Sequence, residues 1–193
     1  MLLSARRAAP QDDRIRYFAQ SAAHICKVVS MKFADRSGWD WAPHDIAMCL
    51  AVMGSAPHSV KAGIVRSIEH EGRVYKNYEI SLDFGRRGQA VILTGNAFDS
   101  HCREFQVQSG DATLTYTESV DHQRSLIVDR AGDAEPVGME STPPLDAALE
   151  VFGHRVRHNS DGTEDLERGV LVVEICAAAH ESIDRGASVS IEG

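Results

Sequence analysis

The feature that most constrains the fold is a long region, from Ser59 to about Arg130, in which apolar and polar residues alternate with a period of two. Successive side chains of a β-strand point to opposite faces, so this alternation is typical of strands with one buried face. Turn residues divide the region, and the strands that we predict between them are 60–68, 74–84, 89–98, 103–108, 112–117 and 125–128. Because a parallel crossover needs about a dozen residues or more, such closely spaced strands predict a broad, mostly antiparallel sheet.

Helical periodicity occurs before and after this region. We predict helices over 12–23, 43–54, 145–157 and about 164–185, further strands over 27–33 and 187–191, and a loop over 131–144. Pro43 suits the first residue of the second helix, and Thr163 is a candidate N-cap of the last one. Together these elements predict an α+β fold, in which a large, predominantly antiparallel open sheet has helices packed on one face.

The composition excludes several classes of function. The chain has 20 basic and 28 acidic residues, a formal net charge of −8, and no basic run that would bind a nucleic-acid backbone. No apolar stretch approaches the roughly 20 residues of a membrane span, so we expect no nucleic acid and no membrane as partners. The cysteines are far apart, and without a secretory leader they indicate buried, reduced thiols in a cytoplasmic protein: Cys26, Cys49, Cys102 and Cys176.

The most specific candidate site is a group of ionisable residues at the start of the second predicted helix. Asp40, His44 and Asp45 surround its first turn. On a helical wheel of about 100° per residue, His44 lies nearly opposite the apolar stripe of residues 46, 49, 50 and 53. A helix N-terminus favours the neutral imidazole, whereas the nearby carboxylates favour the imidazolium. His44 is therefore a candidate general base or acid near neutral pH.

A structural explanation of the same residues stays open. Asp40 or Asp45 can accept hydrogen bonds from the exposed amides of the first turn, which leaves His44 as a surface residue. Trp39 and Trp41, on either side of Asp40, also have two uses. They can stack on a sugar or pack the helix entrance onto the sheet, since both uses need large flat side chains.

Two other groups of residues carry weaker signals. His154 and His158 are four residues apart on a predicted helix and could share a metal ion, but no nearby cysteine or carboxylate completes such a site. We interpret them as part of a solvated helix face, and we predict no metal site. Arg86 and Arg87 form a glycine-flanked basic turn, which could bind an anion but is more typical of a solvated hairpin tip.

The segment around the candidate site resembles a signature of the Gfo/Idh/MocA oxidoreductases. Its sequence GWDWAPHDI, residues 38–46, is similar to a D-x-x-x-H segment that opens a helix, and residues 54–60 are similar to the G-x-x-P-x-x-V that ends it. Weaker similarities follow in the same order, in REFQV at 103–107 and in the closing helix within 169–186. The resemblance extends from residue 3 to residue 191.

This resemblance implies the C-terminal half of such an enzyme. Residues 1–23 would be a remnant of the last Rossmann strand and its linking helix, and residues 24–193 the substrate-binding and oligomerisation domain. His44 would be the catalytic general base or acid, and Asp40 would orient it and hold the substrate hydroxyl. We expect the substrate, a sugar or polyol derivative, to contact Trp39, Trp41 and Asp45. The resemblance also implies a homo-oligomer that forms through the open sheet face.

One departure from the family is large. No G-x-G-x-x-G follows an early strand, no acidic ribose ligand comes after it, and the family's E-K-P segment is missing. We therefore expect this chain to bind no cofactor alone. NAD or NADP is implied for a complete enzyme, in which a nucleotide-binding domain acts in cis or a separate Rossmann-domain chain acts in trans.

Two alternatives stay open at this point. The chain could be a non-catalytic ligand-binding or assembly protein that keeps the fold and the sheet interface without a redox role. It could also come from a truncated or mis-started reading frame, in which case a nucleotide-binding half would be encoded upstream.

Overall fold

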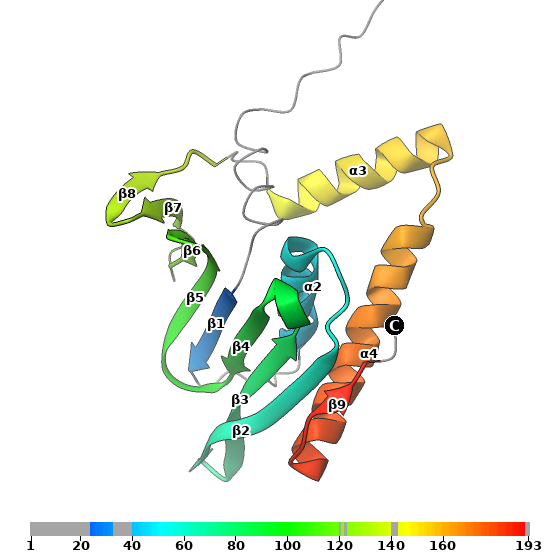
Figure 1. Ribbon diagram of the computed structural model, residues 1–193. Coiled ribbons are helices and arrows are strands. Elements are labelled where there is room, and N and C mark those ends of the chain that lie inside the picture. Colours follow the sequence, from blue (N-terminus) through cyan, green and yellow to red (C-terminus); the bar gives the residue numbers. More distant parts are fainter. Residues whose placement is uncertain (1–23, 33–39, 120, 122, 140–142, 192–193) are drawn as a thin grey trace, which may run out of the picture.

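Figure 1 shows a computed structural model of the protein, which describes residues 24–32, 40–119, 121, 123–139 and 143–191. The helix predicted over 12–23, and with it the predicted remnant over 1–23, lies outside the described residues. The described part contains one sheet and the helices α2, α3 and α4. α2 and α4 lie against the sheet, whereas α3 extends away from it (Figure 1).

Nine strands form the sheet, in the order β8-β7-β6-β5-β1-β4-β3-β2-β9. β1 and β4 are parallel, and the other neighbouring pairs are antiparallel. The strands are β1 (His24–Lys32), β2 (Ser59–His70), β3 (Arg73–Asp83), β4 (Gln89–Gly95), β5 (Ala97–Ser109), β6 (Ala112–Glu118), β7 (Arg124–Arg130), β8 (Asp133–Pro136) and β9 (Val189–Ser190). The predicted fold class, an α+β fold built on a predominantly antiparallel sheet, is confirmed.

β8 lies in the region that the sequence assigned to a loop, and that prediction was wrong. The strand pairs with β7 across a two-residue turn, in which Ala131 and Gly132 both have positive φ, 54° and 91°. The Gly132 amide donates a 2.9 Å hydrogen bond to the Asp129 carboxylate, which supports the turn. All residues of β8 are exposed, so the strand has no apolar alternation that sequence analysis could detect.

β4 and β5 are joined at Asn96, and not at the predicted turn near residue 99. The Asn77 side-chain oxygen accepts a 2.8 Å hydrogen bond from the Ala97 amide. Asn96 Oδ1 accepts another, of 2.9 Å, from the Lys76 amide. The predicted strand over 89–98 was too long because hydrogen bonds to β3, through the Asn77 side chain and the Lys76 amide, fix where the chain turns.

Helix α2 (Ala42–Met53) begins one residue before the predicted helix, so Pro43 is its second residue and not its first. Proline is tolerated there because amides of the first turn have no partner within the helix. Gly54 ends the helix with a φ of 66°, a left-handed conformation that glycine adopts without strain.

Helices α3 (Pro144–His158) and α4 (Thr163–Arg185) correspond to the two predicted C-terminal helices. Thr163 is the first residue of α4 and not its N-cap, a position that Gly162 occupies. Asp161 holds this turn instead, because its carboxylate accepts hydrogen bonds from the Thr163 amide at 3.0 Å and from the Thr163 hydroxyl at 2.6 Å. These bonds lower the pKa of Asp161.

No helix in the described part is both long and apolar enough to cross a lipid bilayer.

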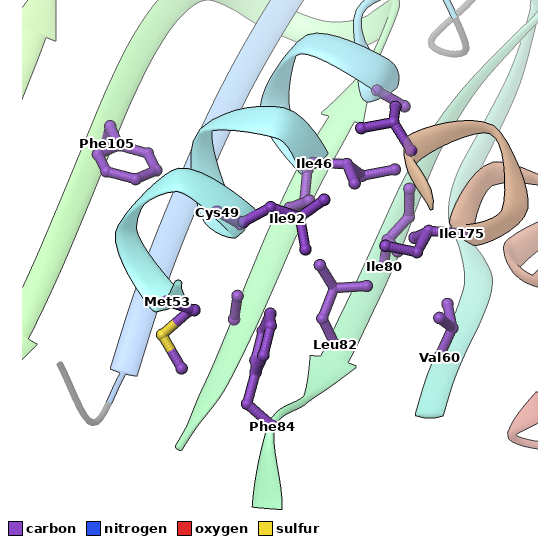
Figure 2. Packing of buried hydrophobic residues seen from close by; sticks show 14 of the residues in the cluster. Ile46, Cys49, Met53, Val60, Ile80, Leu82, Phe84, Ile92, Phe105 and Ile175 are labelled. Carbon is purple, nitrogen blue, oxygen red and sulfur yellow. The ribbon is translucent and has the colours of Figure 1, made fainter. Parts of the chain in front are cut away.

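The core lies between the sheet and the helices α2 and α4 (Figure 2). α2 packs on β4, α4 packs on β2, and the two helices pack on each other. The predicted stripe of α2 is buried, with no member more than 5% exposed: Ile46, Cys49, Leu50 and Met53. Fully buried side chains of β3, β4 and α4 face it: Ile80, Leu82, Ile92 and Ile175.

Ser182 fastens α4 to β2. Its hydroxyl accepts a 2.8 Å hydrogen bond from the Ala62 amide and donates one of 2.7 Å to the Ala187 carbonyl. Ser182 is fully buried, so these bonds satisfy backbone groups that water cannot reach. The serine thus fixes the helix against the sheet and also closes the turn that leads to β9.

α3 and the first half of α4 carry a large exposed apolar surface, which we call the α3–α4 apolar face. On α3, apolar side chains recur at helical spacing and are between 58% and 69% exposed: Leu145, Leu149, Phe152 and Val156. On α4, the exposed fractions lie between 49% and 69% for Leu166, Val170 and Val173. Monomeric proteins seldom expose large apolar side chains in such numbers, so these two rows are suited to contact another polypeptide.

Candidate functional site

The candidate catalytic residues lie at the N-terminal end of α2. At its other end, Arg87 of the short helix η2 (Gly85–Arg87) donates a 3.1 Å hydrogen bond to the Met53 carbonyl. β4 begins just after η2, so α2 ends over the start of β4. The 12 residues of α2 span about 18 Å. Its first turn therefore lies toward the far end of β4, where Gly95 pairs with Ser30 of β1.

The first turn of α2 leaves His44 exposed to solvent. The His44 and Asp45 amides both donate to the Trp41 carbonyl, at 3.0 and 3.2 Å. Asp40, which precedes this turn, is exposed as well. His44 faces away from the buried stripe, as the helical wheel predicts, and its role in proton transfer stays a prediction.

The capping role that the sequence left open for Asp40 is not observed. Trp41 occupies the N-cap position of α2, and its side chain makes no capping hydrogen bond. Asp40 forms no hydrogen bond or ion pair with any of the residues that the structure describes. Asp40 and His44 are both exposed residues.

Trp41 lies partly buried beside His44. The centroids of the two rings are 6.5 Å apart, and their planes are inclined by 53°. The indole N–H of Trp41 is buried and has no hydrogen-bond partner in the described part of the chain. A buried donor without an acceptor costs about 1–3 kcal/mol. Trp39, the other predicted aromatic contact, lies outside the described residues.

Asp45 lies on the inner side of the first turn and is only 1% exposed. A carboxylate near a helix N-terminus is stabilised by the positive end of the helix dipole, which helps to explain its burial. Asp45 does not share the exposed surface of Asp40 and His44. Its predicted contact with the substrate therefore stays a prediction.

A second group of ionisable side chains, the β5–β7 cluster, was not identified as a site from the sequence: Arg103, Tyr116, Glu118 and Arg124. The Glu118 carboxylate accepts hydrogen bonds from Arg103 Nη1 at 3.2 Å and from the Tyr116 hydroxyl at 3.3 Å. It also lies 3.7 Å from Arg124 Nε. Glu118 is directly opposite Arg103 in one ladder and Arg124 in the next, a pairing that only the strand register reveals.

The β5–β7 cluster is on the same sheet face as α2. On β5, Arg103 alternates with Phe105 and Val107, which belong to the core beneath the helices. Arg103 is paired with Val29 near the end of β1, next to the register position where β1 meets Gly95. The cluster is therefore at the same end of the sheet as the first turn of α2. Burial, and then the neighbouring Glu118, raise the pKa of the Tyr116 hydroxyl.

The two weaker sequence signals have structural explanations. The ring centroids of His154 and His158 are 4.3 Å apart on α3, and both residues are exposed. Within the described ranges, no three His, Cys, Asp or Glu side chains are grouped so that they could hold a metal ion. In the basic turn, Arg86 is exposed as expected, whereas Arg87 ties η2 to α2.

A cavity of about 330 Å³ lies between the C-terminal end of α2 and the first turns of α4. Leu50, Gly54, Glu164 and Arg168 are among its lining residues. Glu164 and Arg168 form an ion pair of 2.9 Å across one turn of α4. This cavity is at the opposite end of α2 from His44 and is not part of the candidate site.

Comparison with known proteins gives matches among solved structures. No protein-family model matches the chain, and no curated protein matches it significantly. An aldose-aldose oxidoreductase from Caulobacter crescentus, complexed with glycerol, is 13% identical with a TM-score of 0.73, over 94% of this chain and 59% of its own. UDP-N-acetylglucosamine 3-dehydrogenase from Acidithiobacillus ferrooxidans is 15% identical with a TM-score of 0.68, over 93% and 60%. A 3-ketoreductase from Actinomadura kijaniata, in complex with NADP, is 13% identical with a TM-score of 0.70, over 92% and 57%.

These comparisons establish the fold. The matched structures are oxidoreductases of the Gfo/Idh/MocA type, in agreement with the sequence resemblance. The chain spans between 57% and 61% of the length of the structures that it matches. Identities this low show a shared architecture and leave the substrate open.

The described residues do not fit a dinucleotide. Binding of the pyrophosphate in this class of enzyme uses a glycine-rich turn between a strand and the N-terminus of a helix. The sequence contains no G-x-G-x-x-G, and in the described part no helix begins at such a turn. The described residues therefore offer no cradle for the pyrophosphate of NAD or NADP.

Proposed function

We propose that this chain is the substrate-binding and oligomerisation domain of a Gfo/Idh/MocA-like, NAD(P)-dependent oxidoreductase of sugars or polyols. Its activity would require a nucleotide-binding domain, in cis or in trans. The observation that carries the proposal is an exposed imidazole, His44, at the start of a helix on a sheet whose fold is shared with oxidoreductases of sugars.

In this proposal His44 moves the proton of the reacting hydroxyl. When a secondary alcohol becomes a ketone, the hydroxyl loses its proton to a base, and the carbon loses hydrogen with its electron pair to the cofactor. A ring nitrogen of His44 accepts the proton and returns it when the reaction runs in reverse. Asp40, which has no hydrogen bond or ion pair with the described residues, accepts a hydrogen bond from the substrate hydroxyl and orients the imidazole.

The remaining predicted substrate contacts complete the site in this proposal. The ring of Trp41 beside His44 offers a flat surface on which the apolar face of a sugar can stack. Trp39 and Asp45 are proposed to contact the substrate from either side of this ring.

The hydride acceptor is proposed to come from another domain or chain. The matched structures contain more chain than this one covers, and one of them is complexed with NADP. The α3–α4 apolar face supports contact with such a second body.

The open sheet face, on which Val91 and Leu93 are half-buried, is proposed as the interface between copies. We place the assembly in the cytoplasm, where an unoxidised thiol such as that of Cys176 persists.

The test is a His44→Gln variant in the active assembly, made from this chain with its nucleotide-binding domain. Glutamine keeps hydrogen-bonding capacity but cannot take up a proton. We expect kcat to fall by about 10²–10⁴-fold, while sugar affinity changes little. His154→Gln, on the exposed surface of α3, is the matched control and should keep the full rate.

Full activity of the His44→Gln assembly would show that the assignment of the base is wrong. An assembly that binds sugars but oxidises none of them with NAD or NADP would favour the alternative, a ligand-binding protein without redox function. The first outcome would concern only the assignment of His44 as the base, and the second would concern the proposed redox activity itself.

A further inference from the structure

We infer that α3 pairs with α3 of a second copy of this chain, as two antiparallel helices. The contact is made by the apolar row of α3, which we call the α3 seam: Leu145, Leu149, Phe152 and Val156. This interface is separate from the open sheet face, and it leaves the apolar row of α4 for the nucleotide-binding domain of the proposed function. The inference is carried by the isolation of α3, by the spacing of its apolar residues and by the distribution of its charges.

α3 stands apart from the rest of the described structure. α2 and α4 pack on strands and on each other, whereas α3 packs on none of the described elements to that extent (Figure 1). No described side chain of α3 is buried. A helix of 15 residues is only marginally stable in water by itself, because most helical stability in proteins comes from the packing of an apolar face. α3 therefore requires another polypeptide to cover it.

The α3 seam has the spacing of a coiled coil. Its members are separated by four, three and four residues, as are positions d, a, d and a of successive heptads. On a helical wheel of about 100° per residue they lie within about 60° of one another, and the exposed Val151 lies outside this arc. The small residues Ala148 and Gly153 flank the seam, so a second helix can approach closely. Such a narrow apolar stripe is suited to a single facing helix.

The charges of α3 select the antiparallel orientation. Asp146 and Glu150 lie in its N-terminal half, and Arg155 and Arg157 lie in its C-terminal half. An antiparallel pair places the acidic half of each helix beside the basic half of the other, and it also opposes the two helix dipoles. A parallel pair would place like charges side by side. Arg155 also forms an ion pair with Asp165 of α4, so Arg157 provides most of the uncompensated positive charge.

The same features favour a second copy over an unrelated partner. A two-fold contact between identical surfaces requires that each surface be complementary to itself. With the two-fold axis between residues 150 and 151, Leu149 faces Phe152 of the second copy, and Leu145 faces Val156 of the second copy. Each large side chain of the seam thus meets another apolar side chain. Contact with a nucleotide-binding domain would explain neither the heptad spacing nor the opposite charges of the two halves.

The experiment is sedimentation velocity of the full chain at micromolar concentrations, with the variants Phe152→Ser and Val151→Ser. The two wild-type side chains are 67% and 54% exposed, so neither change removes a core contact. We expect Phe152→Ser to raise the dissociation constant of the α3 pair by about tenfold or more, because each copy loses a ring from the contact. Val151→Ser, outside the seam, is the matched control and should associate like the wild type.

Charge variants test the orientation and the identity of the partner. Asp146→Lys with Glu150→Lys makes α3 basic, and Arg155→Glu with Arg157→Glu makes it acidic. Each of these double variants alone should associate more weakly than the wild type, and an equimolar mixture of the two should recover the association. In a parallel pair, like charges already face each other in the wild type, so the basic variant would associate as the wild type does.

A wild-type chain that stays monomeric, or that associates no more tightly than Phe152→Ser, would overturn the inference and leave the nucleotide-binding domain as the occupant of α3. An equal loss of association in Val151→Ser would exclude the seam as the contact. A mixture of the two charge variants that does not recover would exclude contact between two α3 helices. The His44→Gln assay tests the proposed function separately from all of these outcomes.

Discussion

Gly95, at the end of β4, stands where the neighbouring strand leaves no room for a side chain. A Cβ at this position would lie 2.4 Å from the Lys76 carbonyl oxygen and 2.6 Å from the Asn77 Cα. Both are backbone atoms of β3, and Asn77 is the ladder partner of Gly95. Relief of the clash would therefore disturb the connection that leads into β5.

We expect Gly95→Ala to lower the free energy of unfolding by about 1–3 kcal/mol, as measured by chemical denaturation. Gly63→Ala, in β2, is the control because a Cβ there meets no atom within 4 Å. Its stability should stay within about 0.5 kcal/mol of the wild type. Equal stability of both variants would mean that β3 and β4 do not approach each other so closely in solution.

Some single residues could be predicted from the sequence, and others could not. The exposure of His44 and the burial of Ile46 follow from the geometry of one helix, so the wheel was sufficient. Arg103 and Glu118 are 15 residues apart and meet only because of the strand register. Local patterns do not encode that register, and the β5–β7 cluster was therefore missed.

At the level of elements, segments whose apolar residues recur at the period of their structure were found, and a short strand without such a pattern was not. β3 and α2 alternate or repeat their apolar residues at the period of their structure, and their predicted bounds are close to the observed ones. β8 has no buried residue and was assigned to a loop. The start of α4 was misplaced by one residue because the carboxylate that binds its first amide belongs to Asp161, one residue before the N-cap Gly162.

The first turn of α4 should weaken as the pH falls. Hydrogen bonds from Thr163 lower the pKa of Asp161 in the folded protein, so the ionised carboxylate favours folding. This contribution is fully present above the unfolded pKa, about 4, and is lost as the pH falls through the lower folded value. We expect hydrogen exchange of the first turn of α4, corrected for intrinsic rates, to become faster below about pH 4.

Asp161→Ala should show the same faster exchange at neutral pH, and its exchange should no longer depend on pH in this range. Asp184→Ala, near the other end of α4, is the control and should leave the first turn unchanged. If Asp161→Ala exchanges like the wild type, the carboxylate does not hold this turn.

At the scale of the whole molecule, the order of the strands in the sheet could not be predicted from the sequence. β1 lies between β4 and β5, parallel to one and antiparallel to the other. The position of β1 pairs it with strands that come much later in the sequence. The prediction relied instead on pairing between consecutive strands. The fold class could be predicted, since periodicity and segment length determine it. The resemblance around His44 connected that class to oxidoreductases, and the solved structures support the connection at the level of the fold.

In the proposed function, this chain binds the sugar and a different domain binds the hydride acceptor. Parallel titrations of the purified chain test it most directly, with NADH and NADPH followed by fluorescence and with sugars followed by calorimetry. We expect saturable binding of a sugar or polyol and no saturable binding of either dinucleotide. Saturable binding of NADH or NADPH by this chain alone would contradict it.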